Sequence, residues 1–481
     1  MRDELLSLIK KIEIVREAGD ALASGAKGLN LFGLADTQKG CFLTALTGLR
    51  KNNGPLVFLL PGRDEVRDYR RELNYFYPEQ EMLELYPENL TQVRADAKNQ
   101  EVAAARIMAL RAMHDSDFSI TFVTAESLLQ RLPSVEEIFS NNLLINLEEV
   151  IEQEALIAKL VKMGYERTEQ VEALGQFCLR GDIMDIYPIN EADPVRIEWF
   201  DNNIDSVRSF DIKNQRALQV KDSVEIVSLG ITSKADNASI FEYLSPTATV
   251  IVDEPAKIFE NLRNLFGENV QDSARLFMPE EIIAACDQHG CLSVSALPHR
   301  FFSNQKTFTI PVRAVAPYNR NIDLLVSDLQ GWLNDGLSPL IMLGNVDKAK
   351  NIAESLKNRG LPAYYAKPGQ LFSPGHISVF SGELSAGFRS WGEPWLLLTE
   401  NDIFGVQKKR RIRHKQSGAK IQFFSEIKAG DYVVHAVHGI GRYIGVETLL
   451  VGDVHRDYLL LMYANEDKLY VPVEQVDMLH K

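Results

Sequence analysis

The sequence predicts a multidomain α/β fold: a large α/β domain with a degenerate P-loop, a small α+β domain inserted into it, a second small α/β domain and a C-terminal small β-barrel. Three observations support this prediction. The chain has 481 residues, whereas single cores stop growing at roughly 250–300. Over residues 29–124, short apolar runs alternate with helix-like ones, which is typical of βαβ units in a parallel sheet. The C-terminal segment is instead rich in β-branched and aromatic residues, which predicts short, closely spaced strands.

The first part of the large α/β domain covers residues 1–126. Residues 1–22 have the pattern of one charged amphipathic helix. Three runs are strand-like, in the order LNLFGL, PLVFLLP and SITFVT. The long run NQEVAAARIMALRAM, which precedes the last of them, is helix-like. A sequence that resembles a P-loop follows the first strand, where a working P-loop would lie.

The inserted domain is predicted over residues 127–203. Here the pattern changes to a helix followed by alternating strands in QFCLRGDIMDIYP and VRIEWF. α/β character returns over residues 204–320, where ATVIVDEP has the pattern of a buried strand that ends in two acids. A domain inserted into another one produces such a return.

Three segments complete the chain. A second small α/β domain is predicted over residues 321–405 and the β-barrel over residues 426–481. Residues 406–425 between them are poor in apolar side chains and are interpreted as a linker. The basic residues of this linker are Lys408, Lys409, Arg410, Arg411, Arg413 and Lys415. They could contact DNA, but they lack interleaved aromatic residues, which favours a solvated linker.

Composition excludes several classes of protein. The net charge of -14 and the pI near 5.3 argue against binding of nucleic acid over the whole surface, because clustered Lys and Arg carry the affinity for phosphates. No CxxC pair occurs, so we expect reduced, buried thiols and no cysteine zinc site. The cysteines are Cys41, Cys178, Cys286 and Cys291. The first helix lacks the apolar core of a signal peptide, and no apolar run could span a bilayer, which predicts a cytoplasmic protein with no membrane partner.

The P-loop lookalike departs from the motif at two positions. A P-loop requires Gly-x4-Gly-Lys-Ser/Thr, and Gly33 and Lys39 have the right separation. Gln38 replaces the second glycine, and Gly40 replaces the hydroxyl residue that would bind magnesium. These replacements argue against nucleotide binding here.

The acids of ATVIVDEP complete the pattern of a decayed NTPase domain. Asp253 and Glu254 stand where a Walker B strand would hold magnesium and polarise water. Acids at the end of a strand are common, but two half-motifs in the expected order are more informative than one. We therefore expect no catalytic residue, no bound nucleotide and no cofactor in this chain.

Two further clusters are candidates for protein or metal binding. Arg167 and Arg180 lie in the small inserted domain, where arginine forks make good anchors for a protein partner, although solvated surface charge is the simpler interpretation. His435 and His438 are three residues apart, but Asp431 is a weak third ligand, which favours a turn and no metal. The segment from Asp431 on contains eight acidic residues and only four Lys or Arg, which favours a protein partner over phosphate.

These motifs together resemble the bacterial transcription-repair coupling factors, the Mfd family, over essentially the whole chain. The first segments resemble that family's UvrB-like module, a degenerate version of the excision-repair protein UvrB, with its UvrA-binding domain inserted. The sequence around Tyr165-Glu166-Arg167 and Leu179-Arg180-Gly181-Asp182 is similar to the surface that contacts UvrA. The resemblance implies that Arg167 and Arg180 help to bind UvrA, and that Cys178 replaces an arginine of UvrB.

The end of the chain carries the most specific match. HGIGRYIGVETL and YANEDKLYVPVEQVDML resemble the RNA polymerase-interacting domain, a CarD-like (Tudor-like) barrel that docks on the polymerase β subunit. By that resemblance, Leu449 is the apolar anchor, flanked by Val446 and Thr448. The resemblance also implies a RecG-like motor that uses ATP and magnesium to move on double-stranded DNA, and this motor is expected to be missing from the chain.

The resemblance implies a role in transcription-coupled nucleotide excision repair. The chain would bind RNA polymerase stalled at a lesion and recruit UvrA, act as a monomer, and contact double-stranded DNA mainly through the missing motor. Two alternatives are an active UvrB-like DNA-dependent ATPase, which would need an intact Gly-Lys-Thr, and a stand-alone CarD-like transcription regulator, which would not bind UvrA.

Overall fold

A computed structural model of the chain describes residues 1–26, 28–34, 36–88, 97–229, 237–302 and 306–405 and, in the C-terminal part, residues 430–435, 439–451, 454–462, 468–472 and 479–480. The chain forms two compact units. The first contains nearly all residues from Met1 to Val406, and the second contains the C-terminal segment from Gln407 on. Each unit is described by itself below.

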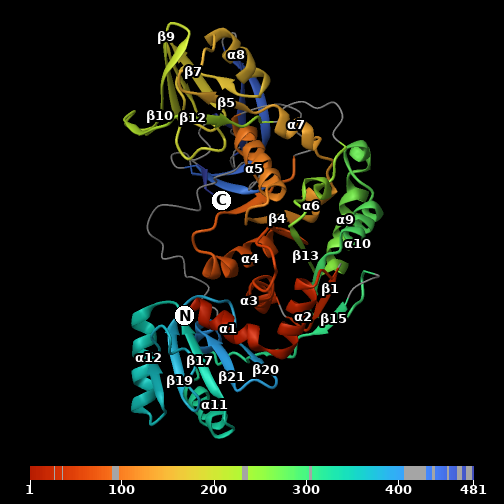
Figure 1. Cartoon of the computed structure of the whole chain (residues 1–481), viewed down its shortest axis with the longest axis vertical. Helices are drawn as coiled ribbons and strands as arrows, with labels where there is room; N and C mark the ends of the chain where they lie inside the picture. Colours follow the sequence, from red (N-terminus) through yellow and green to blue (C-terminus); the bar gives the residue numbers. More distant parts are fainter. Residues whose placement is uncertain are drawn as a thin grey trace. The chain divides into compact units, whose positions relative to one another are not determined.

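The first unit is built around a seven-stranded sheet in the order β15–β1–β14–β13–β2–β4–β3 (Figure 1). All neighbouring strands in it are parallel. The inner strands are short apolar runs buried on both faces, as expected for a parallel sheet between helices. The strands are β1 (Leu29–Phe32), β2 (Leu56–Leu60), β3 (Met82–Leu85), β4 (Ile120–Thr124), β13 (Thr249–Asp253), β14 (Leu292–Ser295) and β15 (Lys306–Thr309).

The helices of this part are α1 (Arg2–Lys11), α2 (Glu13–Ala23), α3 (Asp36–Thr47), α4 (Arg63–Phe76), α5 (Ala97–His114), α6 (Ala125–Leu129), α7 (Val135–Ser140), α9 (Pro255–Glu268) and α10 (Pro279–His289), with the 3-10 turns η1 (Ile240–Tyr243) and η2 (Val270–Arg275). The prediction of one helix over residues 1–22 is wrong. Ile12 has an extended ψ of 122°, which ends α1 before α2 begins, and its side chain is buried.

The elements from β5 to β12, which lie between β4 and β13 along the chain, form the inserted domain. Its main sheet has the order β11–β10–β9–β8–β7–β6, and β12 pairs with β5 beside it. The helix of this domain is α8 (Gln153–Lys162). The strands are β5 (Leu143–Asn146), β6 (Glu166–Arg167), β7 (Gln176–Arg180), β8 (Ile183–Ile186), β9 (Val195–Phe200), β10 (Asn203–Phe210), β11 (Ala217–Val220) and β12 (Ser223–Ile226).

The inserted domain continues past residue 203, where the sequence placed its end. Asn203 pairs with Phe200, so the residues between them are the turn of a β9–β10 hairpin. After this hairpin, β12 returns to pair with β5. Residues 203–226 are therefore part of the inserted domain and not of the large α/β domain.

The second α/β domain contains a six-stranded sheet in the order β16–β20–β21–β17–β19–β18. Its elements are β16 (Val312–Ala314), α11 (Ile322–Asn334), β17 (Ser338–Leu343), α12 (Val346–Asn358), β18 (Ala363–Tyr365), β19 (Ile377–Ser381), β20 (Phe388–Ser390), β21 (Trp395–Thr399) and α13 (Glu400–Phe404). It shares a core with the first domain, where the rings of Phe42 and Phe388 lie 5.0 Å apart. The Glu4 carboxylate also accepts hydrogen bonds from the amides of Gly369 and Leu371, at 2.9 and 3.1 Å.

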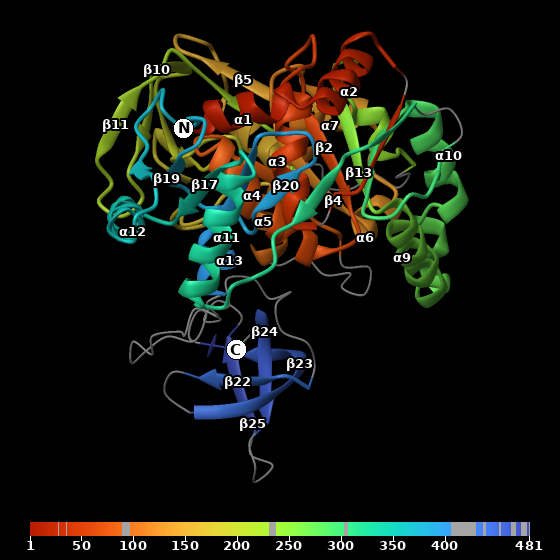
Figure 2. The same cartoon turned by 90° about the horizontal axis from the view of Figure 1, so that it is seen from below.

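The second unit contains a five-stranded antiparallel sheet in the order β25–β24–β23–β22–β26, most of whose strands are labelled in Figure 2. Its strands are β22 (Tyr432–His435), β23 (Gly439–Val451), β24 (Val454–Met462), β25 (Lys468–Pro472) and β26 (Leu479–His480). The predicted closely spaced strands are thus present, but β23 and β24, with 13 and 9 residues, are not short. Closure of this sheet into a barrel stays a prediction.

Candidate functional site

The lysine of the degenerate P-loop is engaged by acids at the end of β13. Lys39 Nζ lies 2.8 Å from Asp253 Oδ1 and 2.8 Å from Glu254 Oε1. The side chains of Lys39 and Asp253 are only 1% and 3% exposed. Burial by itself would lower the pKa of Lys39, but the two adjacent carboxylates raise this pKa above its ordinary value. The lysine is therefore charged, and its charge is neutralised inside the protein.

Of the two acids that contact Lys39, Glu254 also bonds to the backbone. Glu254 has a left-handed backbone conformation, with φ 44° and ψ 66°, and begins α9. Its Oε1 also accepts a hydrogen bond of 2.8 Å from the amide of Ala296, just after β14. A nucleotide phosphate would have to displace both carboxylates from Lys39 before the lysine could bind it.

The two glycines of the loop have reasons to be glycine that do not involve a nucleotide. Gly33 has φ +87°, and a Cβ there would lie 2.7 Å from the Ile310 carbonyl oxygen. A Cβ at Gly40 would lie 2.5 Å from Glu72 Oε2, which accepts a hydrogen bond of 3.1 Å from the Gly40 amide. Gln38 is buried. The carboxylate of Glu72 thus occupies the place where a P-loop hydroxyl would project.

Glu72 connects the loop to the second α/β domain. Its carboxyl also hydrogen-bonds to the side chain of Ser385, whose Oγ accepts a bond of 3.2 Å from Arg71 Nε. Burial raises the pKa of Glu72 to about 8. At neutral pH this carboxyl is therefore mostly protonated.

The two arginines that the sequence pointed to do not lie together. Arg180 is on β7, next but one to Cys178, whereas Arg167 pairs with the buried Phe177 from the edge strand β6. Because side chains alternate between the faces of a sheet, the two arginines belong to opposite faces. Only Arg180 lies on the face that points away from the domain core.

We call this face the outer face of the inserted domain. Cross-strand pairing aligns Cys178, Asp185, Arg196 and Arg208 in one row. Together with their neighbours two positions along each strand, the side chains of this face are Cys178, Arg180, Ile183, Asp185, Arg196, Glu198, Phe200, Ser206 and Arg208.

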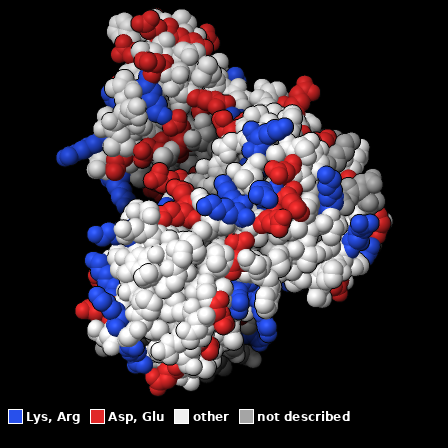
Figure 3. Space-filling view, turned by 60° about the horizontal axis from the view of Figure 1, so that its bottom comes forward, with Lys and Arg blue, Asp and Glu red and all other residues white. Residues whose placement is uncertain are grey.

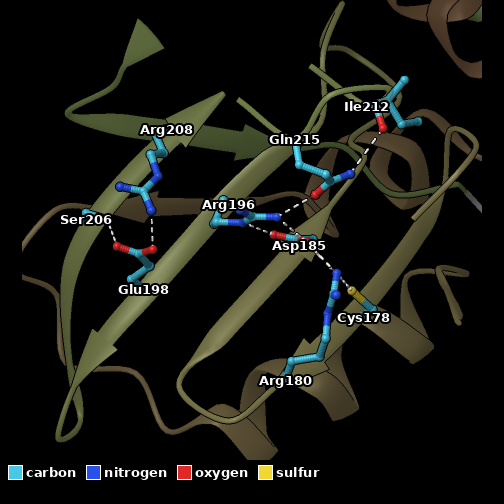
Figure 4. A network of polar contacts seen from close by, with 9 residues as sticks. All are labelled: Cys178, Arg180, Asp185, Arg196, Glu198, Ser206, Arg208, Ile212 and Gln215. Carbon is cyan, nitrogen blue, oxygen red and sulfur yellow. Dashed lines mark hydrogen bonds and ion pairs between the residues drawn. The ribbon is translucent and has the colours of Figure 1, made fainter. Parts of the chain in front are cut away.

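A single buried carboxylate organises the polar part of the outer face (Figure 4). Asp185, which is 2% exposed, accepts bonds of 2.6 and 2.8 Å from Arg196 Nε and a terminal nitrogen. A terminal nitrogen of Arg180 lies 3.2 Å from Asp185 Oδ2 and 3.8 Å from Cys178 Sγ. Hydrogen bonding to Asp185 raises the pKa of Arg196 further. Arg196 is thus fixed by a bidentate contact, whereas the Arg180 side chain is 55% exposed.

The outer face also presents apolar side chains to solvent. Phe200 is 76% exposed and Ile183 38% exposed. Arg208 pairs with Glu198, which also accepts a bond of 2.8 Å from Ser206. Aromatic and arginine side chains together are typical of the residues that dominate protein interfaces.

Sequence reasoning missed Arg196 and Phe200, although a signal was present. In VRIEWF, Arg196, Glu198 and Phe200 alternate strictly with the buried residues of β9. An aromatic residue on the solvent side of such a strand is a reason to expect an interface. Cys41, Cys178, Cys286 and Cys291 are all free and buried, as the sequence predicted.

The proposed polymerase-binding residues all belong to β23. Val446, Thr448 and Leu449 pair with Leu459, Asp457 and Arg456 of β24. In the described pairings, β22 pairs with β23 only over Gly439–Arg442, so the part of β23 from Val446 on is paired on one side. The side chain of Val446 is 38% exposed.

The remaining predictions concern metal, DNA and membrane. His435 ends β22, whereas His438 and the basic run from Lys408 to Lys415 lie outside the described residues. The residues that are described contain no cluster of three or more His, Cys, Asp or Glu that could hold a metal ion. On the face drawn in Figure 3, basic side chains are interspersed with acidic ones. No helix of the described part combines the length and hydrophobicity needed to cross a bilayer.

Comparison with known proteins assigns families to the two candidate surfaces. A family model described as the UvrB interaction domain matches residues 143–229, which include the whole outer face. A second, described as the CarD-like/TRCF RID domain, matches residues 427–481. The first match also ends beyond residue 203, in agreement with the strand pairing.

The relatives described here, which match 90% or more of this chain, are all named transcription-repair-coupling factor. The transcription-repair-coupling factor of Bacillus subtilis (strain 168) is 26% identical over 100% of this chain and 47% of its own length. Those of Staphylococcus aureus strains RF122 and NCTC 8325 are each 26% identical, over 90% of this chain and 43% of their own length. The chain thus spans somewhat less than half the length of these relatives. Along its whole length, the chain is thus similar to transcription-repair-coupling factors.

Proposed function

We propose that this chain binds UvrA and RNA polymerase in transcription-coupled nucleotide excision repair and that it does so in the cytoplasm as a monomer. The observation that carries the proposal is the outer face of the inserted domain, where the exposed side chains of Arg180 and Phe200 share a face with the buried carboxylate of Asp185. The resemblance to the coupling factors supplies the identity of the partners. The proposal assigns UvrA to the outer face and the polymerase β subunit to the C-terminal sheet.

Arg180 is the first contact that we assign to UvrA. Asp185 holds its guanidinium at one nitrogen, so its direction is set while its other donors remain exposed. An acid or a backbone carbonyl of the partner can then bind without first ordering a free side chain. Arg167 lies at the β6 edge of the same sheet and is assigned a secondary contact.

Replacing Arg180 with glutamate is expected to weaken UvrA binding by about 30-fold, because a hot-spot residue contributes about 2 kcal/mol or more. Binding can be measured by titrating immobilised UvrA with the chain. Arg16→Glu makes the same change of charge at an exposed position of α2 and is the matched control. Equal affinities of the Arg180→Glu and Arg16→Glu variants would contradict the assignment, and no binding by the wild type would favour the CarD-like regulator.

The polymerase contact is assigned to β23 beyond Val446. A strand that is paired on one side only can accept a strand of the partner, and the apolar anchor Leu449 would add specificity to the backbone hydrogen bonds. The acidic balance of this segment also fits a protein partner better than phosphate.

Leu449→Arg is expected to weaken binding to the RNA polymerase β subunit by tenfold or more, since it replaces an apolar anchor with a charge. The conservative Leu449→Ile variant should retain most of the affinity. Surface-immobilised β subunit provides the measurement. If the arginine variant binds as tightly as the wild type, Leu449 is not the anchor.

The proposal assigns no ATP hydrolysis and no cofactor to these residues. Lys39 is neutralised by two acids, and Glu72 takes the place of the P-loop hydroxyl. Translocation on double-stranded DNA, with ATP and magnesium, is assigned to the motor that the resemblance implies. An active UvrB-like ATPase would instead need Lys39 to be available to phosphate.

A further inference from the structure

A cluster of arginine and tryptophan side chains lies at the edge of the second α/β domain. β16 is the edge strand of the six-stranded sheet, and β20 is its only neighbour in that sheet (Figure 1 labels β20). Arg313 of β16 lies directly opposite Arg389 of β20. Two residues further along, the amide of Trp391 donates a hydrogen bond of 2.9 Å to the carbonyl of Pro311. The pairing thus continues beyond β20.

The register places the three side chains on one face. Residues directly opposite each other in a sheet share a face, and so do residues two positions apart on a strand. Arg389 lies over the indole of Trp391, with its Cζ 5.2 Å from the ring centroid. The Trp391 side chain is nevertheless 57% exposed, and Arg313 is exposed as well. One side of the indole is therefore covered by a cation while much of the ring faces solvent.

The charges of this cluster are not balanced by the protein. Like charges directly opposite each other destabilise a sheet. In the part of the chain that the structure describes, neither guanidinium group forms an ion pair with an acid. Such local conflicts are expected at binding sites, where the ligand supplies the missing partner.

We propose that Arg313, Arg389 and Trp391 form a binding site for single-stranded nucleic acid. The two guanidinium groups hold one backbone phosphate, and a base stacks on the exposed part of the indole. A guanidinium fork matches the geometry of phosphate oxygens, and an aromatic platform accepts any base because every base has a π-face.

Both features of the cluster favour a nucleotide over an acidic peptide. A run of carboxylates would satisfy the arginines but would leave the exposed indole unused. A nucleotide unit has an anion and a planar ring joined by one sugar, so it can use the arginines and the tryptophan together. The proposal does not depend on the outer face or on the identity of the protein partners.

The test is a titration of the whole chain into a fluorescein-labelled oligothymidylate of about 12 nucleotides, followed by fluorescence anisotropy. Trp391→Ala is expected to weaken binding about tenfold, and Trp391→Phe should retain most of the affinity because it keeps a stacking ring. Arg313→Gln with Arg389→Gln is expected to weaken binding and to lower the dependence of log Kobs on log salt by about 0.7 for each phosphate that the variant no longer neutralises.

Two controls make the result specific. Lys357→Gln removes a positive charge from the exposed side of α12 in the same domain and should leave the affinity unchanged. Thermal unfolding should show that each variant is folded at the temperature of the titration, because the substituted side chains are exposed or half-buried. Wild-type affinity in Trp391→Ala and in the double arginine variant would overturn the proposal. Binding of oligoglutamate as tight as that of the oligonucleotide, with no effect of Trp391→Ala, would overturn it in favour of an acidic protein partner.

Discussion

Replacing Lys39 with methionine is expected to lower the free energy of unfolding of the first unit by about 3–5 kcal/mol, because it leaves a buried carboxylate without its counter-charge. Asp253 is only 3% exposed and has Lys39 as its ion-pair partner at 2.8 Å. Glu254 is 26% exposed and can be solvated in part, so most of the loss is assigned to Asp253. Urea denaturation followed by tryptophan fluorescence provides the measurement.

Two further variants separate this effect from a general loss of charge. Lys39→Met combined with Asp253→Asn should recover part of the stability, since both buried charges are then removed. Lys257→Met breaks an ion pair of 2.7 Å with Glu65, but its side chain is 58% exposed, so about 1 kcal/mol or less is expected. Wild-type stability of Lys39→Met, or ATP turnover by the wild type that this substitution abolishes, would contradict a nucleotide site closed by its own lysine.

Glu72→Gln is expected to stabilise the protein increasingly as the pH rises from 5 to 8. The pKa of Glu72 is raised by burial from 4.5 to about 8, so between these values the folded state holds a proton that the unfolded state has released. Stability then falls by about 1.4 kcal/mol for each pH unit, or about 4 kcal/mol from pH 5 to pH 8. The stabilisation by protonated Glu72 is complete below pH 4.5 and is lost as the pH passes through 8. Glutamine is neutral throughout, and its amide oxygen can still accept the Gly40 hydrogen bond.

The measurement is the difference in unfolding free energy between Glu72→Gln and the wild type at several pH values. This difference should grow with pH up to about 8 and then stay constant. Glu81→Gln, at an exposed position before β3, should give a curve parallel to that of the wild type. A parallel curve for Glu72→Gln as well would show that Glu72 is ionised in the folded protein.

The sequence predicted the parallel sheet, but not the contacts that the residues of the degenerate P-loop make. Gln38 and Gly40 could be recognised in the sequence because they depart from the P-loop motif. The Lys39–Asp253 contact was not visible, because it joins β1–α3 to the end of a strand far along the chain. The role of Glu72 on α4 was hidden for the same reason, since no local pattern marks a carboxylate that fills a site from another helix.

Register explains the other differences between expectation and structure. The sequence analysis placed a domain boundary at residue 203, yet Asp201 and Asn202 turn the chain into β10 of the same sheet. Arg167 and Arg180 seemed equivalent in sequence, but a parallel edge pairing puts Arg167 in register with the buried Phe177. A shift of one position changes the face of a side chain, and single-sequence patterns do not fix the pairing partner of a two-residue strand.

The central claim is that one chain couples UvrA to RNA polymerase through two separate surfaces. The most direct test mixes the chain with UvrA and RNA polymerase and measures the composition of the complexes by size-exclusion chromatography with light scattering. We predict a complex of all three components that loses only UvrA with Arg180→Glu and only the polymerase with Leu449→Arg. Two binary complexes that exclude each other, or loss of both partners with either variant, would contradict the claim.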